Sequence, residues 1–284
     1  PWLRVGTDVR AMAYFNGRPG EGHAVFPMQL DLYLAGTVYN PEQYNKGRLT
    51  LLVNGGVLGS RSEKFSGFQD RFFLREWWAL FDDLPYQLYG KLGQFLPAYG
   101  WRLDDHTSFI RQGQSFDNER QVTGLEVGLN PNYLYAHASI YANGPVSGRS
   151  LGGARHRAAV FLSNDGTPDA PYKAFDQGWG TAWSAGWRDL WWQAGASFMF
   201  EDRPTGTDLW AGANWALNLH EGQHPWKLLN LFPVTYMGEF DVRRTSPEGG
   251  RSSTGLSAFH ELDVLVTEGL FFVARYDWQD PDIE

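Results

Sequence analysis

The feature that most constrains this chain is a two-residue alternation of apolar and polar side chains, clearest in residues 84–93. The apolar phase of this segment comprises Leu84, Tyr86, Leu88, Gly90 and Leu92. The polar phase comprises Gln87, Tyr89, Lys91 and Gly93. A period of two is typical of a β-strand whose two faces meet different surroundings. Pro97 and Gly100 follow it and predict the end of the strand, because proline cannot donate to a ladder and glycine suits a turn.

The same alternation recurs along the whole chain, from Leu3 to Trp278. One clear apolar phase comprises Met28, Leu30, Leu32, Leu34 and Val38. Another comprises Leu134, Ala136, Ala138, Ile140 and Ala142. We count about fourteen such segments and expect roughly 13 to 16 strands, joined alternately by short turns and longer loops, as in membrane barrels.

The composition supports this interpretation. Aromatic residues make up 16% of the chain and charged residues 20%, and the mean hydropathy is −0.40. Many aromatic residues in a chain of low mean hydropathy are expected when only alternate residues face lipid and Trp and Tyr form interfacial girdles. No apolar run reaches the roughly 18 residues of a membrane-spanning helix. The sequence therefore predicts an all-β fold, a single antiparallel transmembrane β-barrel over residues 1–284, in contact with bacterial outer-membrane lipid.

A soluble β-sandwich or lectin-like domain is the competing fold. Its strands also alternate, and exposed Trp side chains would stack on sugars. Against it, about ten strands are long enough to cross a bilayer, and their ionisable residues fall almost wholly on one phase. We therefore favour the barrel.

Two regions leave the pattern open. In the strand expected over 71–81, Phe72, Leu74, Trp78 and Leu80 share a phase that Glu76 interrupts, which a bulge or an interfacial depth would explain. Residues 144–180 include one candidate strand, 157–163. The short turns at 82–85 and 130–132 are out of step with those at 188–189 and 267–269, so 144–180 hides an extra strand, contains one fewer, or one short turn faces outward.

Longer loops are expected near residues 100–119, 144–180 and 243–253. The chain opens directly on a strand, so we expect its numbering to start in the mature protein. It ends in loop-like sequence, 280–284, and we expect at least one further strand beyond it, because a barrel cannot leave an open edge in lipid.

The chain contains no Cys and has a formal net charge of −8. The lack of Cys removes disulfides, thiolate metal sites and covalent c-type haem attachment. The negative charge argues against nucleic acid as a partner. We therefore expect no cofactor and no metal in this chain.

Charged residues on the polar phases are expected to line the lumen. Positive and negative charges both occur. They suit a polar wall that binds water, and they suit a wall that contacts an inserted plug or partner; the sequence leaves these two interpretations open. The predicted lumen-wall residues are Asp31, Lys91, Glu126, Glu239, Asp241, Arg243, Asp263 and Arg275.

The loop after the opening strand carries the cluster Asp104-Asp105-His106, which has the composition of a metal or acid–base site. Adjacent residues rarely converge on one ion without a ligand from elsewhere. We therefore expect a structured loop at the barrel mouth or folded into the lumen, with Arg102 and Arg111 as charge partners.

His137, Ser139 and Asn143 resemble the His-x-Ser and Asn of outer-membrane phospholipase A, which form a triad on the lipid-facing surface. Here the alternation places His137 and Ser139 on the polar phase, away from a lipid substrate. The spacing to Asn143 also departs from that family. A lipid hydrolase is therefore the least favoured function, and we expect no enzyme.

Residues 89–107, YGKLGQFLPAYGWRLDDHT, resemble a motif of bacterial outer-membrane barrels, approximately Y-x-K-x-G-x-F-x-P-x-[YF]-G-x-R-x-x-D-H-T. The motif occurs in barrels of porin–cytochrome conduits for extracellular electron transfer. This resemblance implies a porin-like sheath that houses a multihaem c-type cytochrome, with haem only in that partner subunit. The alternative is a general or solute-selective diffusion porin.

Overall fold

The structure is a computed structural model. It describes residues 2–14, 24–40, 46–58, 72–102, 121–142, 178–204, 206–219, 233–268, 270–280 and 283. In this part of the chain, no helix is long and apolar enough to span a bilayer.

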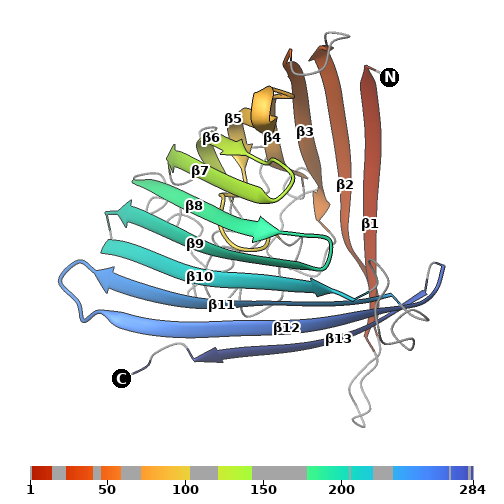
Figure 1. The fold of residues 1–284 in the computed structure, drawn as a ribbon. Coiled ribbons are helices and arrows are strands. Elements are labelled where there is room, and N and C mark those ends of the chain that lie inside the picture. The colour runs from red at the N-terminus through yellow and green to blue at the C-terminus, as the bar shows by residue number, and fades with distance from the viewer. Residues whose placement is uncertain are drawn as a thin grey trace.

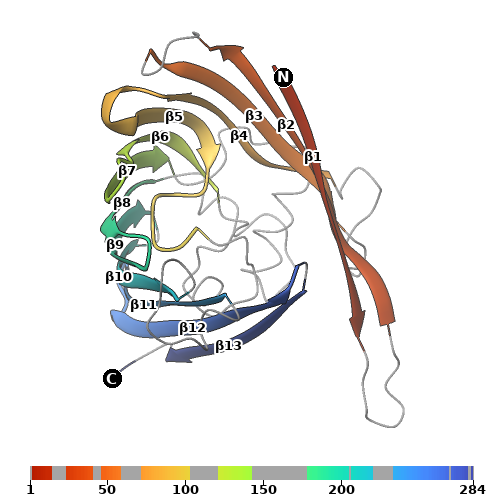
Figure 2. The same ribbon diagram turned by 45° about the vertical axis from the view of Figure 1, so that its right-hand side comes forward.

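In the described residues, thirteen antiparallel strands form one sheet in which each strand pairs with the next along the chain. The sheet curls around an interior that we call the lumen (Figures 1 and 2). In the described sheet, β1 and β13 are the two edge strands. The strands are β1 (Leu3–Tyr14), β2 (Ala24–Tyr39), β3 (Arg48–Leu58), β4 (Phe72–Asp82), β5 (Leu88–Phe95), β6 (Val122–Leu129), β7 (Leu134–Ala142), β8 (Trp179–Arg188), β9 (Trp192–Arg203), β10 (Gly206–Asn218), β11 (Val234–Pro247), β12 (Ser253–Thr267) and β13 (Leu270–Asp280).

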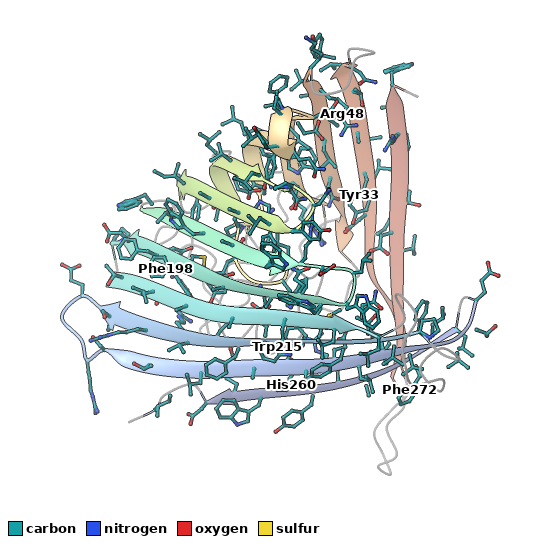
Figure 3. The ribbon with its side chains drawn as sticks, in the orientation of Figure 1. Tyr33, Arg48, Phe198, Trp215, His260 and Phe272 are labelled. Atoms are coloured by element: carbon teal, nitrogen blue, oxygen red, sulfur yellow. The ribbon has the colours of Figure 1, made fainter. Side chains whose placement is uncertain are left out.

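The all-β antiparallel fold predicted from the alternation is confirmed, and the strand number falls within the predicted range. On β9, for example, Phe198 is 40% exposed, whereas the adjacent Met199 is fully buried. Figure 3 marks Phe198, Trp215 and Phe272 on three of the strands. The apolar phases thus face outward, where lipid would cover them, and the polar phases face the lumen.

The phase predicted for β4 was partly wrong. The register with β3 shifts between Asn54 and Gly55, so that Asn54 pairs with Glu76 and Gly55 pairs with Leu74. The extra residue, Arg75, forms a bulge, which changes the face that the following residues occupy. Trp78 and Leu80 consequently line the lumen instead of facing lipid.

The start of β5 also differs from the prediction. Residues 84–87 form the turn between β4 and β5, and Pro85–Gln87 adopt a short 3-10 conformation. Tyr86 and Gln87 have positive φ angles of 61° and 52°, which no strand residue adopts. The sequence pattern placed residues 84–87 in the strand because the residues of this turn happen to alternate between apolar and polar like those of a strand.

The mismatch of turns is explained by the pairing of β7 with β8, from Leu134↔Trp187 to Ala142↔Trp179. No strand therefore lies between them in the sheet, and the candidate strand 157–163 lies outside the described residues. With this count, the short turns after β4, β6, β8 and β12 all lie at one edge of the sheet. The loop expected at 243–253 is shorter in the structure, because β11 continues to Pro247.

Aromatic side chains gather at this edge of the sheet. Tyr133 and Trp187 stack with ring centroids 5.7 Å apart. Trp2, Tyr86 and Trp192 are exposed at other strand ends or turns of the same edge. Amphipathic rings favour the level of the lipid headgroups. The edge thus has the aromatic girdle that the composition predicted.

Placing a charge in the middle of the outward face should be costly. Ala196 faces outward on β9, between Ala185 of β8 and Ala213 of β10. We expect Ala196→Arg to lower the free energy of unfolding in lipid vesicles by about 2–4 kcal/mol, because arginine is poorly solvated at the bilayer midplane. The control Leu190→Arg, in the exposed β8–β9 turn, should cost about 0–1 kcal/mol. Equal losses in urea titrations would contradict the outward assignment.

Candidate functional site

The site is built around residues Leu96–Arg102, which follow β5 and which we call the lumen segment. This segment leaves the sheet and enters the space that the sheet encloses (Figure 2). Pro97 lacks the N–H that a continued ladder would need, and Gly100 has a φ of +51° that favours glycine. The local sequence therefore stops the strand and turns the chain inward.

The far wall of the lumen holds this segment through side chains of β11 and β9. The Tyr99 hydroxyl donates to Asp241 Oδ1 at 2.9 Å, and the Trp101 backbone N–H donates to Glu239 Oε2 at 2.9 Å. The Gly100 N–H donates to Ser197 Oγ at 2.9 Å. Both carboxylates are fully buried. Hydrogen bonds to charged acceptors are the strong ones, so this wall is a firm anchor.

The near wall holds the other end through Arg102. Its guanidinium donates to both oxygens of Glu126, at 3.1 Å to Oε1 and 2.8 Å to Oε2. This bidentate geometry fixes the orientation of both side chains. The lumen segment is therefore bound to β6 on one side and to β9 and β11 on the other.

Glu126 contacts three polar side chains. Besides Arg102, Lys91 Nζ lies 3.1 Å from Oε1, and the Tyr89 hydroxyl donates to Oε1 at 2.7 Å. The same hydroxyl lies 2.7 Å from His137 Nδ1. Lys91 and Glu126 are directly opposite in the β5–β6 ladder, which brings the pair together. One buried carboxylate thus forms ion pairs with two cations.

Glycines at the contact points allow the close approach. A Cβ on Gly100 would overlap the Glu239 carboxylate, and one on Gly212 would lie 2.7 Å from the Tyr99 hydroxyl. A larger residue at either position would push the lumen segment from the far wall. These glycines therefore determine how near the segment lies to β10 and β11.

Gly100→Ala should lower the free energy of unfolding by about 2–4 kcal/mol, because the left-handed φ costs about 1–2 kcal/mol and the new methyl group meets a buried carboxylate. Gly249→Ala is a matched control, since Gly249 also has a positive φ, +71°, but has open space around it. The control should lose only the backbone part, about 1–2 kcal/mol. Urea titrations of both variants that agree within error would refute the steric part of this argument.

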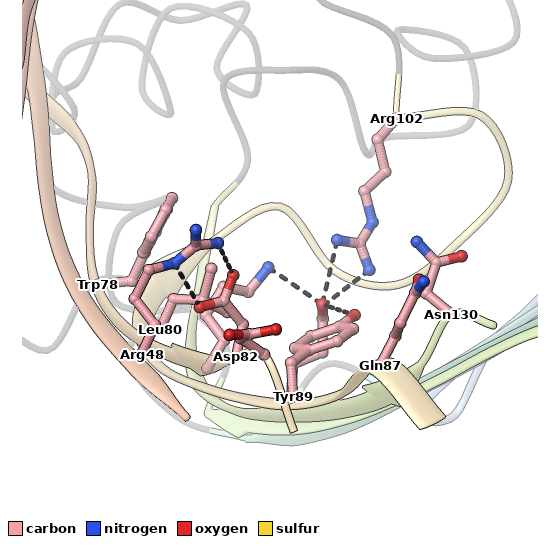
Figure 4. Close-up of a pocket in the computed structure, with 11 residues that line it drawn as sticks. Arg48, Trp78, Leu80, Asp82, Gln87, Tyr89, Arg102 and Asn130 are labelled. Carbon is pink, nitrogen blue, oxygen red and sulfur yellow. Dashed lines mark hydrogen bonds and ion pairs between the residues drawn. The ribbon is translucent and has the colours of Figure 1, made fainter. Parts of the chain in front are cut away.

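A cavity of about 490 Å³ lies between the near wall and the lumen segment. Figure 4 shows Trp78 and Arg48 at one side and Tyr89 and Arg102 at the other. The residues that line it are Arg48, Trp78, Leu80, Asp82, Asp83, Gln87, Tyr89, Lys91, Arg102, Glu126 and Asn130. A second cavity of about 350 Å³ shares Trp78, Lys91 and Arg102. These three side chains therefore stand where the two cavities adjoin.

The structure brings five of the predicted site residues to the lumen segment. Arg102, Lys91 and Glu126 form one cluster, and Glu239 lies across the segment from it. Asp241 belongs to the same far-wall anchor as Glu239. Asp104, Asp105, His106 and Arg111 lie outside the described residues.

The remaining predicted wall residues lie apart from this cluster. Asp31 pairs with Arg75 at 3.2 Å, and Arg243 pairs with Asp208 at 3.1 Å. Arg275 contacts Glu261 at 3.4 Å and Asp277 at 3.0 Å. Asp263 lies on the lumen phase of β12, opposite Thr235 of β11. Most of these charges therefore have partners of opposite sign along the wall.

Several residues of the site were missed from the sequence. Tyr99, Trp101 and Ser197 carried no signal, because their roles depend on contacts across the lumen. Trp78 was missed because the bulge at Arg75 changed the phase of the residues that follow it. Only the interruption at Glu76 pointed to that change.

The side chains considered for lipid hydrolysis have other partners. Ser139 Oγ donates to the Ala182 carbonyl at 3.4 Å, while His137 Nδ1 meets Tyr89. Ser139 is also almost completely buried. Asn143 lies outside the described residues. In the part of the chain that the structure describes, no group of His, Asp and Glu side chains is arranged to hold a metal ion.

Comparison with solved structures identifies the fold. An anion-selective porin from Comamonas acidovorans matches with a TM-score of 0.62 at 11% identity, over 98% of this chain and 79% of that one. OmpT, an outer membrane protein of Vibrio cholerae in its trimer form, matches with a TM-score of 0.48 at 9% identity, over 99% and 89%. A mutant Rh. blastica porin matches with 0.46 at 9%, over 97% and 94%.

No protein-family model matches the sequence, and a search of curated proteins finds no match. The likeness to the Comamonas porin shows the fold of an outer-membrane β-barrel. The predicted fold class is therefore confirmed, and the predicted location in the bacterial outer membrane agrees with it.

Proposed function

We propose that this protein is a diffusion channel of the outer membrane, a porin whose narrow part is formed by the lumen segment. The observation that carries the proposal is the attachment of that segment to both walls, through Arg102 to Glu126 and through Trp101 to Glu239. A polypeptide fixed across a polar lumen would narrow the path of solutes. The adjoining cavities on the near side would be part of that path.

The sheath for a multihaem cytochrome is the competing proposal, and the resemblance of residues 89–107 is its support. The lumen segment argues against it. A cytochrome in the lumen would have to displace Tyr99 and Trp101 from buried carboxylates, at a cost of about 1.5–3 kcal/mol for each bond to a charged group. The channel requires no such displacement.

The two proposals predict different results for the protein purified from outer membranes. A channel should be colourless, and alone in a planar bilayer it should conduct ions in discrete steps. A sheath should copurify with a subunit that has the Soret absorbance of haem. A haem-containing complex whose barrel alone does not conduct would overturn the channel proposal.

A further inference from the structure

The cavity of about 490 Å³ between β4, β5 and the lumen segment combines two kinds of surface. Trp78 and Leu80 of β4 supply an indole and an isobutyl group. Lys91 and Arg102 supply cations. Its volume falls within the range of small-molecule sites. A ligand for this cavity therefore needs both an apolar body and a group that suits these cations.

The cations of the cavity are better exposed than the carboxylate that holds them. Glu126 is fully buried, while the side chains of Lys91 and Arg102 are 11% and 32% exposed. Arg102 uses two of its five N–H groups on Glu126, and an ammonium has three donors. Lys91 and Arg102 share one carboxylate and keep N–H donors that Glu126 does not occupy.

The other charges limit the ligand to a single negative charge. Arg48 neutralises Asp82, with a 3.0 Å bond from Nε to Oδ1, and Asp83 lies in the adjoining turn. The lining therefore holds three cations and three carboxylates, Arg48, Lys91 and Arg102 against Asp82, Asp83 and Glu126, and has no net charge. An anion in this cavity is therefore attracted only at short range, by Lys91 and Arg102. A second negative charge on the ligand would meet the aspartates.

The shape of the charged group favours a carboxylate. A guanidinium presents parallel N–H groups that match two carboxylate oxygens, and the adjacent ammonium adds a third donor. A planar ring attached to the carboxylate would lie toward Trp78 and Leu80, where aromatic and aliphatic contact stabilises it.

We propose that this cavity binds aromatic monocarboxylates, of which benzoate is the simplest, as solutes of the channel. The proposal rests on the proposed channel function. Lys91 and Arg102 bind the carboxylate, and Trp78 and Leu80 contact the ring. Trp78, Lys91 and Arg102 line both cavities, so a solute that passes from one cavity to the other would meet this site.

The test measures block of the potassium chloride current through the purified protein in planar bilayers. Benzoate, acetate and benzamide are the probes, because acetate lacks the ring and benzamide lacks the charge. Benzoate should half-block the current at a concentration about tenfold or more below that of either control, as expected for one charge-assisted interaction. Equal half-blocking concentrations for benzoate and benzamide would overturn the proposal.

Variants assign the effect to the cavity. Arg102→Gln and Lys91→Gln should each raise the half-blocking concentration of benzoate about tenfold, and Trp78→Leu should bring it toward that of acetate. Arg244→Gln is the control, because Arg244 is exposed on the outward phase of β11. If one variant fails to conduct, the others still decide the result. A wild-type protein that does not conduct overturns the channel, whereas one that conducts with unchanged block in all variants overturns only this site.

Discussion

Glu239→Ala/Asp241→Ala is expected to give a channel with larger and more variable single-channel conductance. The variant removes the acceptors of the Trp101 N–H and the Tyr99 hydroxyl. Each hydrogen bond to a charged group contributes about 1.5–3 kcal/mol, so the population with a detached lumen segment should rise on the order of 100-fold or more. Single-channel recording in planar bilayers measures both the mean conductance and the frequency of transitions.

Two further variants make this expectation specific. Tyr99→Phe removes only the bond to Asp241, and it should change the traces in the same direction but less. Asp263→Ala removes a carboxylate of β12 that makes no hydrogen bond to the lumen segment within the described residues. It should leave the variability of the current unchanged. If the double variant and Asp263→Ala behave alike, wall charge alone explains the result and the segment does not define the narrow part.

The sequence predicted the fold well because the alternation is local. Lipid-facing side chains are apolar, and their lumen-facing neighbours are polar. About ten residues of one strand therefore suffice to predict which side chains face lipid. Lys91 and Glu126 could be assigned to the lumen in this way, each from its own strand. The prediction failed where one residue altered the period, as Arg75 does in β4, and at Tyr86, where a turn imitates a strand.

The site could not be predicted because its contacts are not local. Tyr99 and Asp241 are 142 residues apart, and they meet only because the sheet curls through the five strands between β5 and β11. The sequence gives no measure of that curvature. It does show that Pro97 and Gly100 end β5, and hence that a loop begins there, but whether the loop lies at the mouth or inside depends on acceptors on the far wall.

Glu126→Ala is expected to lower the free energy of unfolding by about 3–5 kcal/mol, because it leaves Lys91 and Arg102 without the buried carboxylate that neutralises them. The Tyr89 hydroxyl also loses its hydrogen bond to Glu126. Asp82→Ala is the matched control, since it breaks an ion pair with Arg48 whose side chains are 44% and 21% exposed. That loss should be about 0–1 kcal/mol, as for other exposed pairs. Urea titration in lipid vesicles measures both.

The double variant Lys91→Met/Glu126→Leu separates burial of charge from loss of packing. It replaces the paired charges of two directly opposed residues with apolar side chains of similar size, and such replacements are often neutral. It should therefore recover much of the stability that Glu126→Ala loses, although Arg102 still lacks its partner. If lumen water solvates Lys91 and Arg102 fully, Glu126→Ala will cost no more than Asp82→Ala and the double variant will recover nothing. That result would mean that Glu126 does not hold the near end of the lumen segment, and the anchor would have to be assigned to the far wall alone.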